Sequence, residues 1–219
     1  MKRFLLARHG ETEWNREGRI QGWSQVSLND VGRRQARALG EFLAETYPNV
    51  EAIHASDLPR AVETVSLLRE ASGWGDVPVT YDRAWRERDF GVYQGLASEK
   101  FFEEHPEFAL LERGQEAAAA VPECGESYLA FRERVLEAWA TLTETNHDVV
   151  LLVAHGGVLR TILGSILGLG LREALQTLSH ENTGMAEVEY DCTTGEAAIV
   201  HRHRADHLAA VGRPEGRTT

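Results

Sequence analysis

The sequence predicts an α/β fold in which helices cover both faces of a mainly parallel sheet. Short apolar runs typical of buried strands alternate along the chain with longer segments of helical periodicity. The run DVVLLVA at 148–154 is almost continuously apolar, as expected of a central parallel strand that is covered on both faces. Two of the apolar runs end in a histidine followed by glycine, where a strand would give way to a turn. We therefore expect a three-layer α/β/α sandwich.

The first half of the chain predicts three strands joined by two helices. One helix has capping residues from Ser27 onward and ends near Pro48. The next is expected to begin with Ser56 or Asp57 as its cap and Pro59 in its first turn. In chain order the expected elements are the strand Phe4–Ala7, the helix up to Pro48, the strand Val50–Ala55, the helix up to about Ala71 and the strand Val77–Tyr81.

The second half begins with mixed helical pieces at about 92–125, which we interpret as a lid inserted into the domain. Residues 1–205 are assigned to a single domain, and 206–219 to a flexible tail. The elements expected after the lid are the helix Glu126–Thr145 with Ser127 as a cap, the strand Asp148–Ala154, the helix Val158–Leu167, and a hairpin of Gly184–Tyr190 with Glu196–His203.

The composition fits one soluble domain, excludes several classes of protein and disfavours some kinds of partner. The chain has 219 residues, 42% hydrophobic content and a formal net charge of −11, which excludes collagen, a disulfide miniprotein and a disordered tail. An acidic surface disfavours nucleic acid and anionic membranes as partners. Lys2 and Lys100 are the only lysines, so nearly all positive charge is on arginine, which binds phosphate or carboxylate bidentately.

The N-terminus and the cysteines indicate a cytoplasmic protein. MKRFLLARHG contains an apolar run too short for a signal sequence, and no segment approaches about 18 consecutive apolar residues. Cys124 and Cys192 are far apart and form no metal-binding pattern, which fits a reducing compartment. We expect both cysteines to be buried or half-buried.

Basic residues follow the expected strands at one edge of the sheet. Arg8 and His9 end the first strand, Arg60 follows the second, and His155 ends the central one. Ligands of open α/β sheets bind at the carboxyl ends of the strands. Together with two helix N-termini, these side chains would make a cationic pocket suited to a phosphoryl group.

Two histidines in such a pocket suggest chemistry beyond binding. A neutral imidazole can attack phosphorus when its other nitrogen is held by a hydrogen bond, giving a phosphohistidine. Arginines would stabilise the charge on the transferring group. The leaving alcohol needs a proton, and the best candidate donor is a carboxyl group in the segment WRERDFG at 85–91.

These residues stand in blocks that resemble a known family. RHGETEWN at 8–15 resembles the RHGET signature of the histidine phosphatase superfamily, in the branch shared with cofactor-dependent phosphoglycerate mutase. Further matches, in order, are 21–23, 56–61, 87–91 and 155–157. The resemblance spans residue 3 to about 190 and implies a phosphoglycerate mutase-like fold.

The resemblance also implies a role for each matching residue. His9 would be the phosphorylated nucleophile, and Glu87 the general acid and then the base for water. No metal and no cofactor is implied. The phosphate would be bound by Arg8, Asn15, Arg60, His155 and the backbone near Gly156, with Gln21 and Gly22 lining the substrate side.

The lid favours a phosphatase over a mutase. Family mutases have a lysine shortly after the segment that carries the general acid, and they have an Arg-Arg pair in a longer lid. Here Ser98 stands at the lysine position, with Lys100 two residues later, and Arg113 is the only arginine in 101–121. PECGES at 122–127 resembles the entry to the last long helix in phosphatase members.

We therefore expect a metal-independent phosphomonoesterase of the histidine acid phosphatase type, acting on a small phosphorylated metabolite. A cofactor-dependent phosphoglycerate mutase and a non-catalytic phosphate-binding regulator are the alternatives. The natural ester and the oligomeric state stay open.

Three further groups have plain structural interpretations. Phe101, Phe102 and Phe108 are expected to pack the lid against the core rather than to line the substrate. Glu11, Glu13, Arg86, Arg88 and Asp89 are expected to form supporting ion pairs. The spacing of His201, His203 and His207 resembles that of a metal site. Because alternate residues on an edge strand without a carboxylate partner rarely bind a metal, we expect no metal there.

Overall fold

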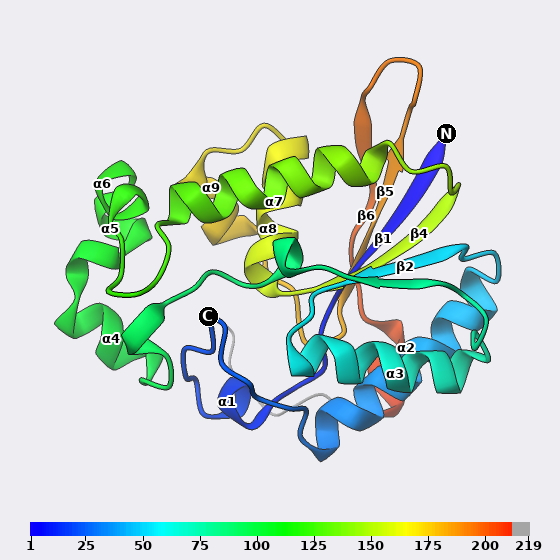
Figure 1. Cartoon of the computed structure of the whole chain (residues 1–219), viewed down its shortest axis with the longest axis horizontal. Coiled ribbons are helices and arrows are strands. Elements are labelled where there is room, and N and C mark those ends of the chain that lie inside the picture. Colours follow the sequence, from blue (N-terminus) through cyan, green and yellow to red (C-terminus); the bar gives the residue numbers. More distant parts are fainter. Residues whose placement is uncertain (212–219) are drawn as a thin grey trace.

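The computed structural model describes residues 1–211 and shows a six-stranded mixed sheet between two layers of helices (Figure 1). The strand order is β3-β2-β4-β1-β5-β6. β1, β2, β3 and β4 run parallel, β5 is antiparallel to β1, and β6 is antiparallel to β5. The strands are β1 (Lys2–Arg8), β2 (Ala52–Ala55), β3 (Val79–Tyr81), β4 (Val149–Ala154), β5 (Met185–Tyr190) and β6 (Ala197–Arg204). The predicted fold class is confirmed.

The helices divide between the two faces of the sheet. α2 and α3 cover one face, and α7, α8 and α9 the other (Figure 1). The α-helices are α1 (Glu13–Arg16), α2 (Asp30–Thr46), α3 (Pro59–Ser72), α4 (Ser98–Glu104), α5 (Leu110–Arg113), α6 (Gln115–Ala119), α7 (Tyr128–Thr143), α8 (Gly156–Ile166) and α9 (Leu171–Thr177). Short 3₁₀ turns are η1 (Arg83–Trp85), η2 (Gly91–Tyr93), η3 (Pro106–Phe108) and η4 (Asp206–Ala210).

The apolar run of β4 is explained by its place in the sheet. Val150 and Leu152 pack in the core under α7 and α8, whereas Leu151 and Val153 pack in the core under α2 and α3. All four side chains are fully buried. Because successive residues of a strand point to opposite faces, only a strand with helices on both sides needs apolar residues at every position.

Two helix starts differ from the sequence prediction, and both differences concern the site. α3 has Leu58 as its N-cap with no side-chain cap bond, because Asp57 pairs instead with Arg86. α8 begins at Gly156, with His155 as N-cap, two residues earlier than expected. Ser127 caps α7 as predicted, accepting a bond from the backbone N–H of Ala130.

The segment 92–125 forms small helices beside one end of the sheet (Figure 1). It has a small core of its own, in which Phe101 stacks on Phe108 with ring centroids 5.5 Å apart and Ile20 packs beside them. Phe101 and Phe108 are buried there, whereas Phe102 is 39% exposed. The packing prediction therefore holds for Phe101 and Phe108 and is wrong for Phe102, which is absent from this small core.

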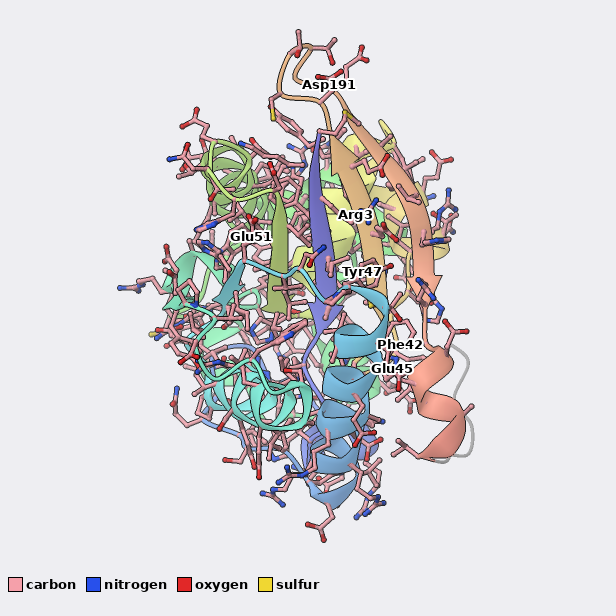
Figure 2. All side chains as sticks on the ribbon, turned by 90° about the vertical axis from the view of Figure 1, so that its right-hand side faces the viewer. Arg3, Phe42, Glu45, Tyr47, Glu51 and Asp191 are labelled. Atoms are coloured by element: carbon pink, nitrogen blue, oxygen red, sulfur yellow. The ribbon has the colours of Figure 1, made fainter. Side chains whose placement is uncertain are left out.

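A polar cluster around Glu187 ties the β5–β6 hairpin to β1 and to the end of α2. Figure 2 labels Arg3 and Tyr47, the residues that β1 and the end of α2 contribute to it. Glu187 on β5 accepts a 2.6 Å hydrogen bond from the Tyr47 hydroxyl and pairs with Arg3 at 3.0 Å. Arg204 donates to the same hydroxyl at 2.9 Å. Since Glu187 is 4% exposed, these partners are what make its burial tolerable.

The chain after Ala205 differs from the expected flexible tail. Asp206–Ala210 forms η4, in which Leu208 is buried and the His207 ring lies 5.6 Å from that of Phe42 on α2. Burial of the apolar Leu208 side chain stabilises this turn. The rest of the predicted tail, 212–219, lies outside the described residues.

The cysteines were predicted wrongly. Both Cys124 and Cys192 are exposed and free, because each lies in a turn rather than on a core-facing position. None of the helices within residues 1–211 is long and apolar enough to cross a membrane.

Gly32 on α2 allows a backbone approach next to His9. A Cβ atom added there would lie 2.0 Å from the carbonyl oxygen of Glu11 and 2.6 Å from its nitrogen. Both neighbours are backbone atoms that cannot rotate away.

We therefore predict that Gly32→Ala lowers the free energy of unfolding by about 1–3 kcal/mol, as overpacking does. Gly75→Ala is the matched control, because an added Cβ there meets nothing within 4 Å. Urea unfolding of the two variants measures the difference, and equal stability would contradict the close approach.

Candidate active site

Parallel pairing of β1 with β4 brings the two predicted histidines together. Arg8 is paired with Ala154 in register, so His9 and His155 leave the sheet at the same edge. The backbone N–H of His9 donates to the carbonyl of Ala154 at 2.9 Å. The two imidazole ring centroids are 5.1 Å apart, which is close enough for both rings to contact one phosphoryl group.

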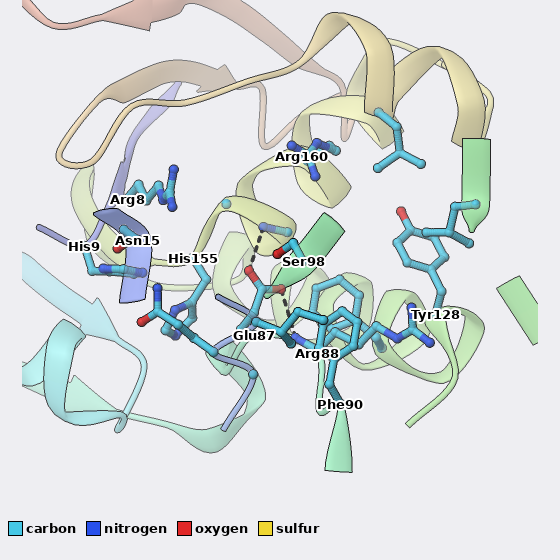
Figure 3. Close-up of a pocket in the computed structure, with 18 of the residues that line it drawn as sticks. Arg8, His9, Asn15, Glu87, Arg88, Phe90, Ser98, Tyr128, His155 and Arg160 are labelled. Atoms are coloured by element: carbon cyan, nitrogen blue, oxygen red, sulfur yellow. Dashed lines mark hydrogen bonds between the residues drawn. The ribbon is translucent and has the colours of Figure 1, made fainter. Parts of the chain in front are cut away.

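A cavity of about 330 Å³ opens at this edge. Glu87 and His155 lie centrally in the close-up, with Arg8, His9 and Asn15 on one side and Arg88 and Tyr128 on the other (Figure 3). Every site residue predicted from the sequence lines the cavity, namely Arg8, His9, Asn15, Gln21, Gly22, Arg60, Glu87, His155 and Gly156. The structure thus brings the predicted set together.

A hydrogen bond fixes the tautomer of His9. Its Nδ1 lies 2.7 Å from the carbonyl oxygen of Gly10. A carbonyl only accepts, so Nδ1 carries the proton and Nε2 keeps its lone pair. Burial, and then the charges of Arg60 and Arg8, hold the pKa of His9 well below 6.5. The ring is therefore neutral at physiological pH, as a nucleophile must be.

His155 lines the cavity and is held by Ser56. Its Nε2 lies 2.8 Å from the Ser56 hydroxyl. Its Nδ1 is buried and has no partner among the described residues. Burial, followed by the charges of Arg60 and of other nearby groups, lowers the pKa of His155 well below 6.5. A Ser56 hydroxyl that donates to Nε2 places the proton of this neutral ring on Nδ1.

Two arginines present unpaired donors at the same place. Arg60 is 1% exposed and donates to the carbonyls of Gly22 at 2.7 Å and Ser24 at 3.1 Å. Arg8 donates to the carbonyl of His180 at 2.8 Å. The Nε atoms of both arginines are buried without a partner in residues 1–211. Burial lowers the pKa of Arg60 to about 10, so the guanidinium stays charged at neutral pH.

Glu87 is oriented by backbone groups. Its carboxylate accepts hydrogen bonds from the N–H of Arg88 at 2.9 Å and of Gly157 at 3.0 Å (Figure 3). A Cβ on Gly157 would lie 2.2 Å from a Glu87 oxygen, so the second glycine of HGG is required for this approach. The carboxyl is thereby held between α8 and the segment that follows β3.

The loop 178–184 completes the support of the nucleophile. The side-chain nitrogen of Asn182 donates to the carbonyl of His9 at 3.1 Å and to the side-chain oxygen of Asn15 at 3.2 Å. The Asn15 oxygen also accepts from the backbone of Thr12. Its own amide nitrogen has no partner in the described part of the chain and is left for the cavity that Asn15 lines. Sequence reasoning did not find Asn182.

Comparison with known proteins agrees with this geometry. The model of the histidine phosphatase superfamily (branch 1) matches residues 4–202. The chain belongs to this superfamily. A structure of Bacillus stearothermophilus YhfR superimposes with a TM-score of 0.83 and 28% identity, covering 95% of this chain and 100% of that one.

The superfamily relatives include phosphatases and mutases. The glucosyl-3-phosphoglycerate phosphatase of Mycolicibacterium vanbaalenii is 34% identical, over 77% of this chain and 76% of its own. The 2,3-bisphosphoglycerate-dependent phosphoglycerate mutase 2 of Gloeobacter violaceus is 32% identical, over 94% of this chain and 88% of its own. The comparisons support phosphatase activity without excluding mutase activity.

Three polar residues of the cavity were missed from the sequence. Arg88 was predicted to form a supporting ion pair, but no carboxylate lies within 4.0 Å of it in the described residues. Arg160 and Tyr128 were not singled out. A helical register from Gly156 would have found Arg160, since residues four apart share a face.

The histidines near the C-terminus were expected to bind no metal. Among residues 1–211, no three or more His, Cys, Asp or Glu side chains are positioned to hold a metal ion. His201 instead lies 3.8 Å from Glu187, and His207 accepts from or donates to the Thr183 hydroxyl at 3.1 Å.

The buried histidines should make the protein less stable in acid. Burial lowers the pKa of His9 and His155 well below 6.5 and that of His180 to about 4. In the unfolded chain they titrate near about 6.5. Below that pH the unfolded state binds more protons, so the free energy of unfolding falls as the pH is lowered, by up to roughly 1.4 kcal/mol per pH unit for each histidine.

Urea unfolding at a series of pH values from about 7 to 5 measures this slope. His180→Gln removes one of the titrating groups and should flatten it. A stability that does not change over this range would contradict the burial of neutral histidines.

Proposed function

We propose that this protein hydrolyses phosphomonoesters through a phosphohistidine formed on His9. The observation that carries the proposal is the Nδ1–Gly10 bond, which leaves Nε2 of a neutral buried imidazole as the nucleophile. The phosphatases among its superfamily relatives also support it.

Binding would use the buried donors that lack protein partners. The Nε atoms of Arg8 and Arg60 and Nδ1 of His155 supply N–H groups. The N-terminus of α8 adds its positive dipole end. A phosphate dianion accepts hydrogen bonds from groups of this kind, so its binding would account for donors that are buried without protein partners.

In the first step, Nε2 of His9 attacks phosphorus. The N–P bond forms while the bond to the ester oxygen breaks, and the Glu87 carboxyl gives its proton to the leaving oxygen.

In the second step, water attacks the phosphohistidine. The Glu87 carboxylate takes a proton from water as the new O–P bond forms and the N–P bond breaks. Inorganic phosphate leaves, and His9 and the Glu87 carboxyl return to their starting states. Arg8 and Arg60 stabilise the charge on the phosphoryl oxygens in both steps.

The cavity favours hydrolysis over phosphoglycerate mutase activity. Ser98 lines it at the position where family mutases have lysine, and Arg113 of the lid is exposed and outside its lining. The lid contributes Phe102 and Leu110 in place of cations. A mutase must hold a second phosphate under its lid, and this lid brings no charged group to do so.

We predict that His9→Ala lowers the rate of p-nitrophenyl phosphate hydrolysis in EDTA by more than about a thousandfold, because the covalent route is lost. His147→Ala is the matched control, since His147 precedes β4 at the opposite edge of the sheet. Released p-nitrophenol and phosphate are measured.

Full activity of His9→Ala would refute the mechanism. Efficient interconversion of 2- and 3-phosphoglycerate without release of phosphate would establish the mutase instead. Phosphate binding without turnover of any ester would establish the regulator.

Glu87→Gln tests the proton donor. We predict a loss of about 10²–10⁴-fold on an alkyl phosphate, because the leaving alkoxide needs the proton. For p-nitrophenyl phosphate, the rate of phosphoryl transfer to His9 should fall much less. The reason is that p-nitrophenolate is a good leaving group and does not need a proton from Glu87. Burst kinetics separate this step from hydrolysis, and equal losses on both esters in the burst would contradict the role.

A further inference from the structure

The turn at 181–184 holds the backbone that carries the nucleophile. The backbone N–H of Thr183 donates to the carbonyls of Arg8 at 3.1 Å and of His9 at 3.2 Å. The ring of His9 is itself bonded to the carbonyl of Gly10, the next residue along the chain. A shift of this backbone would therefore also turn Nε2, the atom that attacks phosphorus.

Thr183 has a backbone conformation that its side chain disfavours. Its φ is +61°, in the left-handed region, where a β-branched residue is an outlier. Its side chain is fully buried, and its hydroxyl donates to the carbonyl of Asn182 at 2.7 Å. A strained residue of this kind persists only where its surroundings hold it. The contacts of Thr183 therefore decide whether its N–H stays directed at the two carbonyls.

His207 makes such a contact. Its Nε2 lies 3.1 Å from the hydroxyl oxygen of Thr183. The hydroxyl has a single proton, which it gives to the carbonyl of Asn182, so the His207 ring is the donor in this bond. Burial lowers the pKa of His207 to about 4. The ring is therefore neutral at pH 7, with its one proton on Nε2.

The 3₁₀ turn η4 keeps the His207 ring in place. η4 packs against α2, where Phe42 lies 5.6 Å from the ring of His207 and the Leu208 side chain is buried (Figure 2). Neither His207 nor Thr183 lines the cavity. His207 thus does not contact a substrate there, and its route to the reaction passes through Thr183.

We propose that His207 is a positioning residue for the nucleophile. Its N–H holds the hydroxyl of Thr183, and the strained turn then keeps the carbonyls of Arg8 and His9 fixed. This inference rests on the proposed hydrolase activity and adds to it a group from the segment after β6. A nucleophile that is displaced by a fraction of an ångström transfers the phosphoryl group more slowly even when the substrate still binds.

Amide hydrogen exchange tests the first link without a measurement of activity. His207→Leu keeps an apolar side chain on Phe42 but removes the N–H, so the Thr183 amide should exchange about tenfold faster. His207→Gln retains an N–H donor and should restore most of the protection. The amide of Leu152 in β4 reports unfolding of the core. A Thr183 exchange rate that changes only in step with that of Leu152 would overturn the proposal.

Steady-state kinetics with p-nitrophenyl phosphate test the second link. We expect His207→Leu to lower kcat about tenfold and to change KM by less than about twofold, because the phosphate-binding side chains are untouched. His207→Gln should keep most of the wild-type kcat. His201→Leu is the matched control, since His201 lies on β6 and contacts Glu187 instead of Thr183. An unchanged kcat in His207→Leu would overturn the proposal.

A double-mutant cycle separates action through Thr183 from a general loss of stability. Thr183→Ala removes the hydroxyl, so His207→Leu added to it should lower kcat no further. A second fall of about tenfold in that background would show that His207 acts by another route, and this too would overturn the proposal.

The wild-type activity separates this inference from the function on which it rests. If the wild-type protein hydrolyses no ester, the hydrolase is refuted, and the position of His9 is followed by the NMR signal of its Nδ1 proton. A change of that signal in His207→Leu that His207→Gln reverses would support the positioning role. An unchanged signal would overturn it.

Discussion

The parallel pairing of β1 with β4 is the constraint on which the site depends. It places His9 and His155 at one edge with their rings 5.1 Å apart, although 145 residues lie between the two histidines in the sequence. β2 pairs with β4 on its other side and brings Ser56 under His155. The register of the strands thus brings the site together, and the sequence has only to place the functional side chains at the ends of those strands.

Buried donors without protein partners are the electrostatic consequence of this arrangement. His155, Arg8, Arg60 and Arg88 each have such an atom, and all four residues line one cavity. Arg3, His180 and His207 also have a buried nitrogen without a hydrogen-bond partner in the described residues, but they do not line the cavity. The gathering of four such residues around one cavity explains how a chain with a net charge of −11 can bind an anion. Capture depends on contacts of short range, because the field of the whole surface opposes it.

Several residues away from the cavity position the groups in it. Arg134 on α7 donates to the carbonyls of Ala84 at 2.8 Å and Arg86 at 3.1 Å, which holds the segment that leads to Glu87. The Trp23 indole donates to the carbonyl of Glu87 at 2.7 Å. These bonds fix the acid between α8 and the lid, where small displacements would separate it from the ester oxygen.

The sequence by itself determined the fold class, the strand ends and the nine residues that line the cavity as predicted. It could do so because periodicity and the blocks around His9, Glu87 and His155 are local signals. It did not determine the partner of Arg88, the exposure of Cys124 and Cys192, or the packing of Leu208 on α2. Those depend on which surfaces meet after folding. Only the tertiary structure decided that Arg88 and Arg160 face a cavity without a carboxylate partner in the described residues, because ion pairing is a matter of distance between segments that are remote in sequence.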